Sequence, residues 1–441
     1  MRDFIYYITH IGSSLIYFFF LKKSQCWSVA RMRDWQLKKM SKLWEYASVH
    51  VPYYRGISEK TGIHKIQSWD DFHKLPILTK DIVRKNFNDL KADNLPSSRF
   101  VENSTSGSTG SNFYFYSDFR QHYFYEALLL RKFNMMGLRY PSCKKMIIWG
   151  SSFDIKKVKS RKFSKLKSWL TNNYIFSEYN LSETNMGSLC KWIAENKPDS
   201  IQSYPSILER LARYANKNEL NLSVPVIHTG GEKTYDYQRQ LIESTFKCRL
   251  FDFYGARDMP FAGMSCNDSD KIHIFQENLI FEVLDDNGNE LHEGEGDIIM
   301  TNLHNRVMPF IRYSIGDRAV IGDCNEQCKC GIKLQQIDEI VGRKFDVLSF
   351  PDGSSVGGTF WTLLLRSVNG ISDFQIIQES DNSIVIKYIK DEFETLTDDC
   401  KTFIINKIRE YCGNGFPVKF MQVDEILRTV AGKRQFIISK K

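Results

Sequence analysis

Between residues 144 and 255, short apolar runs alternate with stretches of helical periodicity, and most of the runs end in glycine or another small residue. The runs are KKMIIWG at 144–150, SIQSYPS at 200–206, PVIHTGGE at 225–232 and CRLFDFYG at 248–255. Intervening segments such as SILERLARYANKNEL and YDYQRQLIESTF repeat their apolar residues every three or four positions. Strands that alternate with helices form βαβ units and a parallel sheet. The sequence therefore predicts an α/β domain that binds its ligand at the carboxyl ends of the strands, where the glycines and serines lie.

The pattern changes on both sides of this region. The first 100 residues are mostly helical in periodicity, whereas the pattern after residue 275 is all-β. A break follows, and beyond it the runs read as strand, strand, helix and strand. We therefore expect a large N-terminal domain at 1–340 with a helical region at 1–100, βαβ sheets and a β-barrel-like part, then a hinge at 341–346 and a small α+β domain at 347–441.

Composition indicates a globular protein that favours anionic partners. Of the 441 residues, 42% are hydrophobic and 25% are charged, which excludes a disordered chain. The net charge of +8 favours a nucleotide, a phosphate, a membrane surface or a nucleic acid without choosing among them. Ten cysteines, most of them isolated, argue against a disulfide framework and for a reducing, cytoplasmic compartment.

Two segments have the composition of surfaces that contact membranes. FIYYITHIGSSLIYFFFLKK at 4–23 is interrupted by polar residues, and its apolar parts are too short to span a bilayer. IKKVKSRKFSKLKSWL at 155–170 combines seven Lys and Arg residues with apolar residues that fit one broad helical face. We expect a docked amphipathic helix at the first segment and a solvated basic face at the second. Peripheral contact with the inner membrane face is the alternative for both.

The stretch STSGSTGS at 104–111 concentrates glycines and hydroxyl groups in eight residues. Gly107 and Gly110 permit tight turns in which several backbone N–H groups point at one anion. Serine and threonine hydroxyls add donors for phosphate oxygens, but no Gly-Lys-Ser/Thr sequence follows, so the stretch is not a Walker loop. Taken alone, it is more typical of a flexible polar surface loop.

Further motifs follow this loop in the chain. They are HTGGEKTY at 228–235, FDFYGARDMP at 251–260, PFIRYSIGDRAVIGD at 309–323, VGRKFD at 341–346 and ILRTVAGKRQF at 426–436. In this order and spacing, the set resembles the adenylate-forming superfamily. It is most similar to the phenylacetate–CoA ligase group and, within it, to the CapK-like capsular polysaccharide biosynthesis proteins. The resemblance runs over nearly the whole chain.

The resemblance implies a two-step reaction with ATP and Mg²⁺. A carboxylate attacks the α-phosphate of ATP and gives an acyl adenylate and pyrophosphate, and a nucleophile such as the CoA thiol then takes the acyl group. The loop at 104–111 would hold the phosphates, and the glycines after residue 229 would lie along the adenine. The expected nucleotide-binding residues are Ser104, Ser106, Gly107, Ser108, Thr109, Gly110, Gly230, Gly231, Glu232, Tyr254, Gly255, Asp317 and Arg343.

The same resemblance assigns catalytic roles. Lys433 would bridge the attacking carboxylate and the α-phosphate, where it neutralises charge that grows in the transition state. Asp258 matches the acidic Mg²⁺ ligand of the family, which is usually the longer glutamate. Thr109 completes the expected catalytic set at the phosphates, and Asp317 would accept both ribose hydroxyls. The acid itself would contact Tyr204, Phe261, Ala262 and Gly263.

Three cysteines and one histidine form a candidate metal site. Cys266 and His273 lie in AGMSCNDSDKIHIF, and Cys328 and Cys330 lie in CNEQCKCGIKL, with Cys324 nearby. Three thiolates and one imidazole are a common structural zinc set with no open position. Some relatives in the phenylacetate–CoA ligase group carry a comparable site. Buried free thiols are the alternative.

We interpret the chain as an AMP-forming ligase that activates a carboxylic acid and passes the acyl group to a thiol or a sugar in surface polysaccharide biosynthesis. Its expected cofactors are ATP, Mg²⁺ and structural Zn²⁺, with CoA as a co-substrate and no nucleic-acid partner. A stand-alone aryl- or acyl-CoA ligase is one alternative. The other is a non-catalytic, zinc-stabilised binding module at a membrane or a nucleic acid. The sequence leaves the acid, the acceptor and the oligomeric state open.

Overall fold

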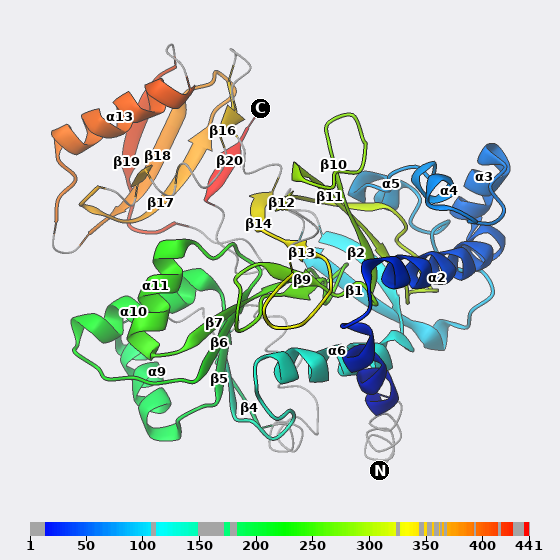
Figure 1. Cartoon of the computed structure of the whole chain (residues 1–441). Coiled ribbons are helices and arrows are strands. Elements are labelled where there is room, and N and C mark those ends of the chain that lie inside the picture. Colours follow the sequence, from blue (N-terminus) through cyan, green and yellow to red (C-terminus); the bar gives the residue numbers. More distant parts are fainter. Residues whose placement is uncertain are drawn as a thin grey trace. The chain divides into compact units, whose positions relative to one another are not determined.

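The structure, a computed structural model, describes most of the chain and divides it into two compact units (Figure 1). The described residues are 14–106, 112–148, 172–176, 183–322, 327–343, 348–350, 355–356, 361, 364–365, 368–391, 394–412, 416–426 and 436–440. Unit 1 comprises residues 1–315 and 320–339, and unit 2 comprises residues 316–319 and 340–441.

Unit 1 begins with helices whose ends follow local sequence signals. They are α2 (Val29–His50), α3 (Pro52–Thr61), α4 (Trp69–His73) and α5 (Lys80–Lys85), preceded by helical residues at 14–24. The Ser28 side chain caps α2 by accepting from the Arg31 backbone N–H. Helix α3 starts with Pro52 in its first turn and ends at Gly62, whose φ of 70° suits glycine.

The large sheet of unit 1 confirms the predicted α/β class. Its strands are β3 (Lys145–Ile148), β4 (Asn173–Phe176), β5 (Ser200–Ser203), β6 (Val226–Gly230), β7 (Arg249–Tyr254), β8 (Gly263–Met264), β9 (Ile272–Ile274) and β13 (Gln336–Ile337). They are ordered β13-β9-β8-β7-β6-β5-β3-β4, and the strands from β7 to β4 pair in parallel. Each of the four apolar runs identified from the sequence supplies one of the parallel strands. Their carboxyl ends therefore meet at one edge of the sheet.

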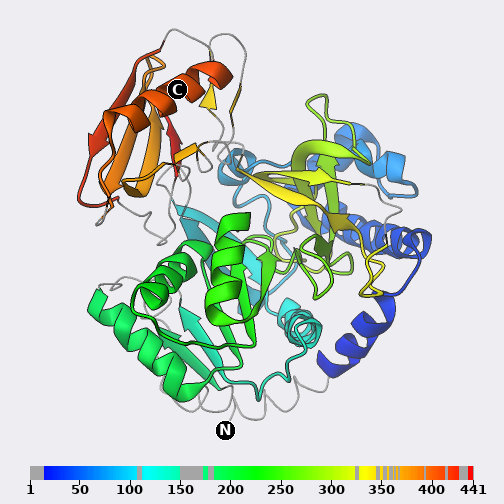
Figure 2. The same cartoon turned by 60° about the vertical axis from the view of Figure 1, so that its left-hand side comes forward.

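Helices cover both faces of this sheet (Figures 1 and 2). Helices α9 (Glu183–Asn196), α10 (Pro205–Lys217) and α11 (Asp236–Phe246) lie on one face, and α6 (Gln121–Met135) lies on the other. Side chains of a strand alternate between the faces, so Ile227 packs in the apolar cluster under α9–α11 while Val226 packs in the cluster under α6. The two faces of one strand thus belong to two different cores.

Further strands complete unit 1 and lead into unit 2. Strands β1 (Phe100–Ser106), which follows a short 3₁₀ turn at Ser97–Arg99, and β2 (Asn112–Asp118) form a hairpin in register from Phe100–Asp118 to Ser106–Asn112. Strands β10 (Leu279–Leu284), β11 (Gly294–Asn302), β12 (Tyr313–Ile321) and β14 (Glu339–Arg343) form a four-stranded sheet in that order. This sheet is the β-rich region predicted after residue 275.

The remainder of unit 2 is a small α+β fold. Its elements are β15 (Leu348–Ser349), β16 (Ser355–Val356), β17 (Ile371–Gln378), β18 (Ile384–Lys390), α13 (Asp398–Cys412), β19 (Val418–Gln422) and β20 (Ile437–Ser439). The four-stranded sheet has the order β19-β18-β17-β20. Ile404 and Ile408 of α13 are fully buried in its core with Ile376, Ile386 and Ile437 of the strands. The predicted sequence of strand, strand, helix and strand matches these elements.

The helical segment at 14–24 docks on unit 1 through one side. Leu21 is fully buried, whereas Ile16 and Phe19 are 72% and 66% exposed. No helix in the described ranges is both long and apolar enough to cross a bilayer. Residues 4–13 and the basic stretch at 155–170 lie outside the described residues.

Candidate functional site

The end of β6 provides a flat backbone surface. Gly230 is its last residue, and a Cβ there would approach the Phe253 carbonyl oxygen of the neighbouring strand to 3.2 Å. Gly231 follows with a φ of 80°, which side chains rarely adopt. The Glu232 carboxylate accepts from the backbone N–H of Ser206, at 3.3 Å, in the first turn of α10. Strand β6 therefore ends in a buried glycine followed by an exposed one, and the flank of this turn is held against α10.

The end of β7 leads into a tight loop that carries Asp258. Gly255 has a φ of 158°, and a Cβ there would lie 3.1 Å from the Phe261 backbone nitrogen. The Ala262 N–H donates to the Tyr254 carbonyl at 3.1 Å and closes the loop. Asp258 is 7% exposed, and its Oδ2 accepts from the Tyr313 hydroxyl at 2.6 Å. One carboxylate oxygen is thereby fixed, and the group is oriented before any ligand binds.

The hairpin of β1 and β2 is joined to the same loop. The Arg257 guanidinium donates to the backbone carbonyl of Ser104 on β1 at 3.0 Å. Ser106 is the last residue of β1, so the predicted phosphate loop is the connection of this hairpin. The structure therefore brings the start of that loop next to the segment that carries Asp258.

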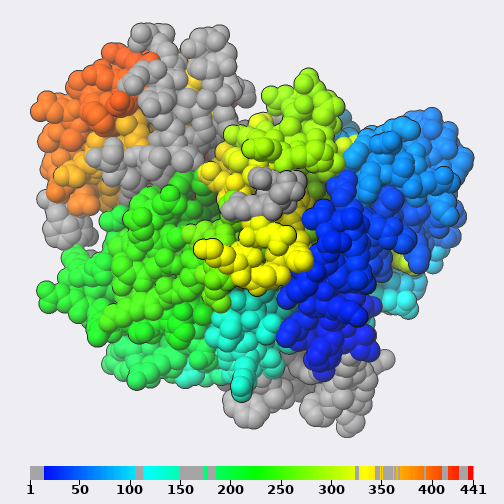
Figure 3. Space-filling view, viewed as in Figure 1, coloured from blue at the N-terminus to red at the C-terminus, as the bar shows by residue number. Residues whose placement is uncertain are grey.

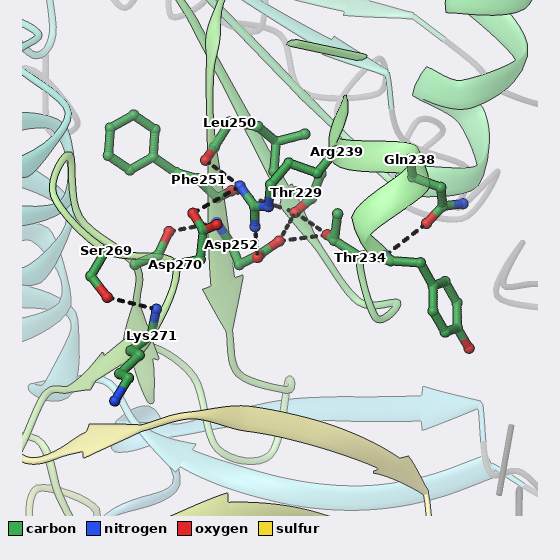
Figure 4. Close-up of polar contacts among 12 residues, drawn as sticks. Thr229, Thr234, Gln238, Arg239, Leu250, Phe251, Asp252, Ser269, Asp270 and Lys271 are labelled. Atoms are coloured by element: carbon green, nitrogen blue, oxygen red, sulfur yellow. Dashed lines mark hydrogen bonds and ion pairs between the residues drawn. The ribbon is translucent and has the colours of Figure 1, made fainter. Parts of the chain in front are cut away.

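A polar network on the α9–α11 face ties β6, β7 and α11 together (Figure 4). The Asp252 carboxylate accepts from the Thr229 hydroxyl at 2.7 Å, from the Thr234 hydroxyl and from the Arg239 guanidinium. The Asp252 N–H donates to the Ser265 hydroxyl at 2.9 Å. The network holds the strand ends and the turn at 231–235 in one arrangement. The network was not expected from the sequence, although the acidic residue inside the aromatic run FDFY is a signal of this kind.

Two buried ionisable groups lie on the opposite face, beneath α6. Lys132 and His228 are 3% and 1% exposed. Burial lowers the pKa of Lys132 to about 7. Burial, followed by the charge of Lys132, lowers the pKa of His228 well below its ordinary value. The sequence analysis did not single out either group.

The residues predicted to line an acid pocket differ in their surroundings. The Phe261 ring contacts the rings of Phe253 and Tyr125, with centroids 5.6 and 5.7 Å apart. Ala262 and Gly263 are buried where the chain turns from β7 to β8. Tyr204 is 1% exposed and packs in the apolar cluster under α9–α11. Contact with an acid stays a prediction for all four predicted residues.

The three cysteines and the histidine of the candidate metal site meet in unit 1. Cys266 follows β8, His273 lies on β9, and Cys328 and Cys330 precede β13, which pairs with β9. The Sγ atoms of Cys266 and Cys328 are 3.5 Å apart, and Cys330 Sγ is 3.4 Å from His273 Nε2. All four ligand atoms lie within 4.8 Å of one another.

This donor set fits a tetrahedral metal ion. Zinc–thiolate bonds of about 2.3 Å place tetrahedral ligand atoms about 3.8 Å apart, close to the observed spacing. Burial lowers the pKa of His273 to about 4, so its imidazole is neutral and offers a lone pair. Burial also raises the pKa of the Cys266 and Cys330 thiols, a cost that a bound cation offsets. The segment that carries the two last cysteines lies against the N-terminal helices, where the Lys333 N–H donates to the Gln25 carbonyl at 2.7 Å (Figure 3).

Comparisons with known proteins agree on one relationship. Residues 348–440 match the family model described as the CapK C-terminal domain. Protein CapK of Staphylococcus aureus is 26% identical over 417 residues, which cover 92% of this chain and 88% of that protein. The chain is a CapK homologue with the fold of the adenylate-forming ligases.

Two further relatives connect the CapK homologue to acyl-CoA ligases. A phenylacetate-coenzyme A ligase of Thermus thermophilus is 28% identical over 202 residues, or 44% of each protein. The crystal structure of a 2-hydroxyisobutyryl-CoA ligase in the postadenylation state, bound to R3-HIB-AMP, superposes with a TM-score of 0.76 at 18% identity. That match covers 95% of this chain and 92% of the ligase, and it shows the shared fold.

The CapK homologue gathers part of its predicted site in unit 1. Ser104, the glycines after Thr229, Tyr254 and Asp258 lie on the hairpin and the strand ends described above. Asp317 lies on β12 within unit 2, and Arg343 is the last residue of β14. Outside the described residues lie Gly107, Ser108, Thr109, Gly110 and Lys433.

Proposed function

We propose that the CapK homologue is an AMP-forming ligase that activates a carboxylic acid as its acyl adenylate and transfers the acyl group to a thiol. The supporting observation is the glycine surface at the end of β6 beside the loop that carries the oriented Asp258, on the fold of adenylate-forming CoA ligases. Anion binding at strand ends of this type is general for open α/β sheets.

Each predicted residue has a chemical task in this proposal. The side-chain-free backbone at Gly230 and the exposed Gly231 accommodates the flat adenine, and Tyr254 offers an aromatic face. Asp258 keeps one oxygen available for Mg²⁺, which neutralises phosphate charge when bound. The hydroxyls of the 104–111 loop donate to phosphate oxygens, and Asp317 accepts the ribose hydroxyls. Lys433 stabilises the charge that develops between the carboxylate and the α-phosphate.

The acceptor is the second part of the proposal. The relationship to CapK favours a role in capsular or surface polysaccharide biosynthesis, with the acyl group passed to a sugar directly or through a thiol. The relationship to a phenylacetate-coenzyme A ligase favours CoA as that thiol. We propose that the protein acts in the cytoplasm, where these substrates would meet it. The exposed apolar side chains at Ile16 and Phe19 support peripheral contact with the inner membrane face.

Pyrophosphate exchange tests the activity. Carboxylate-dependent ATP–pyrophosphate exchange is measured over a broad panel of acids with the wild type, Lys433→Ala and Asp317→Ala. We expect the Lys433 variant to lose about 10²–10³-fold in rate, as for other electrostatic contacts made in a transition state. The matched control is Lys440→Ala, because Lys440 is a lysine of the same unit whose ammonium pairs with Glu379 at 2.8 Å. Absence of ATP binding by the wild type contradicts the proposal.

We further propose that the cluster of Cys266, His273, Cys328 and Cys330 holds one structural Zn²⁺. Purified protein should contain one zinc per chain, and a strong chelator should lower the melting temperature, since binding energy at such a site is folding energy. Cys330→Ser should lose both effects. Cys26→Ser is the control, because this exposed thiol is near the same loop but outside the cluster. Buried free thiols would give no zinc in either protein.

A further inference from the structure

Lys132 is a buried ammonium in the layer between α6 and the large sheet. The residue is 3% exposed. Its Nζ lies 4.2 Å from the centre of the Phe253 ring on β7 and 6.0 Å from the centre of the Phe133 ring on its own helix. Aromatic faces attract a cation, but they replace only part of the hydration that burial removes.

The ammonium of Lys132 has no anionic partner in the described part of the chain. Its contacts there are the two aromatic faces, and no acceptor forms a hydrogen bond or an ion pair with it. The neighbouring Arg131 is equally buried but pairs with Glu277 at 2.9 Å. Lys145, another buried lysine over the Phe133 ring, donates to two backbone carbonyls at 2.9 and 2.7 Å. Of these three cations, Lys132 alone lacks a charged or hydrogen-bonding partner.

His228 adds a second unsatisfied group at the same place. The residue lies on β6 and is 1% exposed, and its Nδ1 has no hydrogen-bond partner among the described residues. The depressed pKa keeps the imidazole neutral, so it retains one N–H donor. Buried polar groups in native proteins are nearly always paired, and exceptions indicate a bound water, an ion or a function.

These two groups lie deeper than the surface proposed for the nucleotide. His228 precedes Gly230 by two residues on β6 and shares its face, so it lies about 7 Å further from the strand end. The Phe253 ring that covers Lys132 also contacts Phe261 edge to face, with centroids 5.6 Å apart. Phe261 is one of the residues predicted to line the acid pocket. Lys132 therefore lies behind that aromatic pair, and His228 lies on the same face of the sheet, away from the reacting end.

We propose that Lys132 and His228 bind a second carboxylate of the substrate, so that the acid activated by this enzyme is a short dicarboxylic acid. This inference rests on the proposed adenylation activity. One carboxylate reacts at the strand end. The other accepts the N–H of the His228 imidazole, about 7 Å deeper along β6, and pairs with the Lys132 ammonium. An acid with an apolar tail would instead leave the ammonium buried and unpaired, which selects against it.

Matched acids test this assignment. Pyrophosphate exchange is measured with linear dicarboxylic acids from malonate to suberate and with the monoacids that carry a methyl group in place of the second carboxylate. The proteins are the wild type, Lys132→Met and Lys132→Arg. We expect the wild type to favour one diacid over its monoacid by about 10–100-fold in kcat/KM, the range for a hydrogen bond to a charged group. Lys132→Met should abolish or reverse this preference through KM, and Lys132→Arg should retain part of it.

Lys145→Met is the matched control, because this lysine is buried to the same extent and already has partners. It should lower stability and leave the ratio of diacid to monoacid unchanged. Exchange with monoacids alone, or a ratio that Lys132→Met does not alter, overturns the inference while adenylation stands.

A binding measurement separates the two proposals. The same diacids and monoacids are added to wild type and Lys132→Met without ATP, and the melting temperature is recorded. A shift by a diacid in the wild type but not in the variant supports the anion site even if no acid supports exchange. If neither exchange nor the melting temperature distinguishes a diacid from its monoacid, the inference is wrong.

Discussion

The two faces of the large sheet differ in how their charged and polar side chains are paired at the ends of β6 and β7. Under α11, the Asp252 carboxylate is satisfied by three side chains, Thr229, Thr234 and Arg239. Under α6, Lys132 and His228 have no hydrogen-bonding partner at Nζ and Nδ1 among the described residues. A satisfied network fixes structure, whereas an unsatisfied buried group costs stability that a bound ligand can recover. We therefore interpret the face under α11 as structural and the face under α6 as the one that binds the substrate.

Helix α6 itself carries both a paired and an unpaired buried cation. Arg131 and Lys132 are consecutive on α6 and are both nearly inaccessible, but only Arg131 has a carboxylate partner. Arg131→Met should lower the free energy of unfolding by about 3–5 kcal/mol, because it leaves Glu277 buried without its cation. Urea denaturation measures the change. The double variant Arg131→Met/Glu277→Met should recover much of the loss, and a single-variant cost below about 1 kcal/mol would contradict a structural role.

The Asp252 network predicts the next largest effect. Asp252→Asn removes the charge that pairs with Arg239 and should cost about 2–3 kcal/mol, the upper range for hydrogen bonds to a charged group. Asp270→Asn is the control, since Asp270 contacts the same arginine at 3.2 Å but is 52% exposed. An exposed pair is worth about 0–1 kcal/mol. Urea denaturation measures both losses. Equal losses in the two variants would mean that Asp252 stabilises the fold no more than an exposed ion pair does.

Lys132→Met should change stability in the opposite direction, with a gain of about 1–3 kcal/mol, because an unpaired buried charge is replaced by an apolar side chain of similar length. The gain depends on pH. Burial lowers the pKa of Lys132 to about 7, against about 10.4 in an unfolded chain. Below pH 7 the lysine is protonated in both states and the penalty is complete. Between pH 7 and about 10 the folded protein has lost the proton that the unfolded chain retains, so the wild type gains stability and the difference shrinks.

Urea denaturation of both proteins over this pH range checks the sign. His228, the titratable group that faces the ammonium, stays neutral throughout the range because its pKa is depressed. A stability difference that is constant from pH 6 to pH 10 would mean that Lys132 keeps an ordinary pKa and has a partner.

The strands and the candidate metal ligands could be predicted from the sequence, because both depend on local sequence pattern and residue type. The runs that end at Gly150, Gly231 and Gly255 have the length and spacing of parallel strands, and the structure has strands there. Cys266, His273, Cys328 and Cys330 stand out by residue type, and the structure brings them together, although the bound ion stays a prediction.

The sequence does not indicate the binding face, because that face depends on contacts between distant segments. In RKFNMMG, Lys132 follows another basic residue and reads as part of a solvated helix surface. Its burial becomes evident only when α6 packs over β6 and β7. Asp252 is similar, since its partners come from α11 and from the turn after β6. Sequence periodicity identifies helices and strands. Whether a charged side chain finds a partner becomes known only from the tertiary structure.

The smallest expected effects come from removing single polar groups, one on each face of the sheet. Thr234→Val removes one hydroxyl donor to Asp252 without changing the shape of the side chain, and it should cost about 1 kcal/mol. His228→Leu replaces a buried ring whose Nδ1 is unpaired with an apolar side chain, so we expect no loss in the free energy of unfolding despite the burial of this residue. Both values come from urea denaturation at pH 7. Because His228 is the more buried residue, burial alone predicts the reverse order. If His228→Leu proves the costlier change, its imidazole has a structural partner, and the contrast between the two faces fails at that residue.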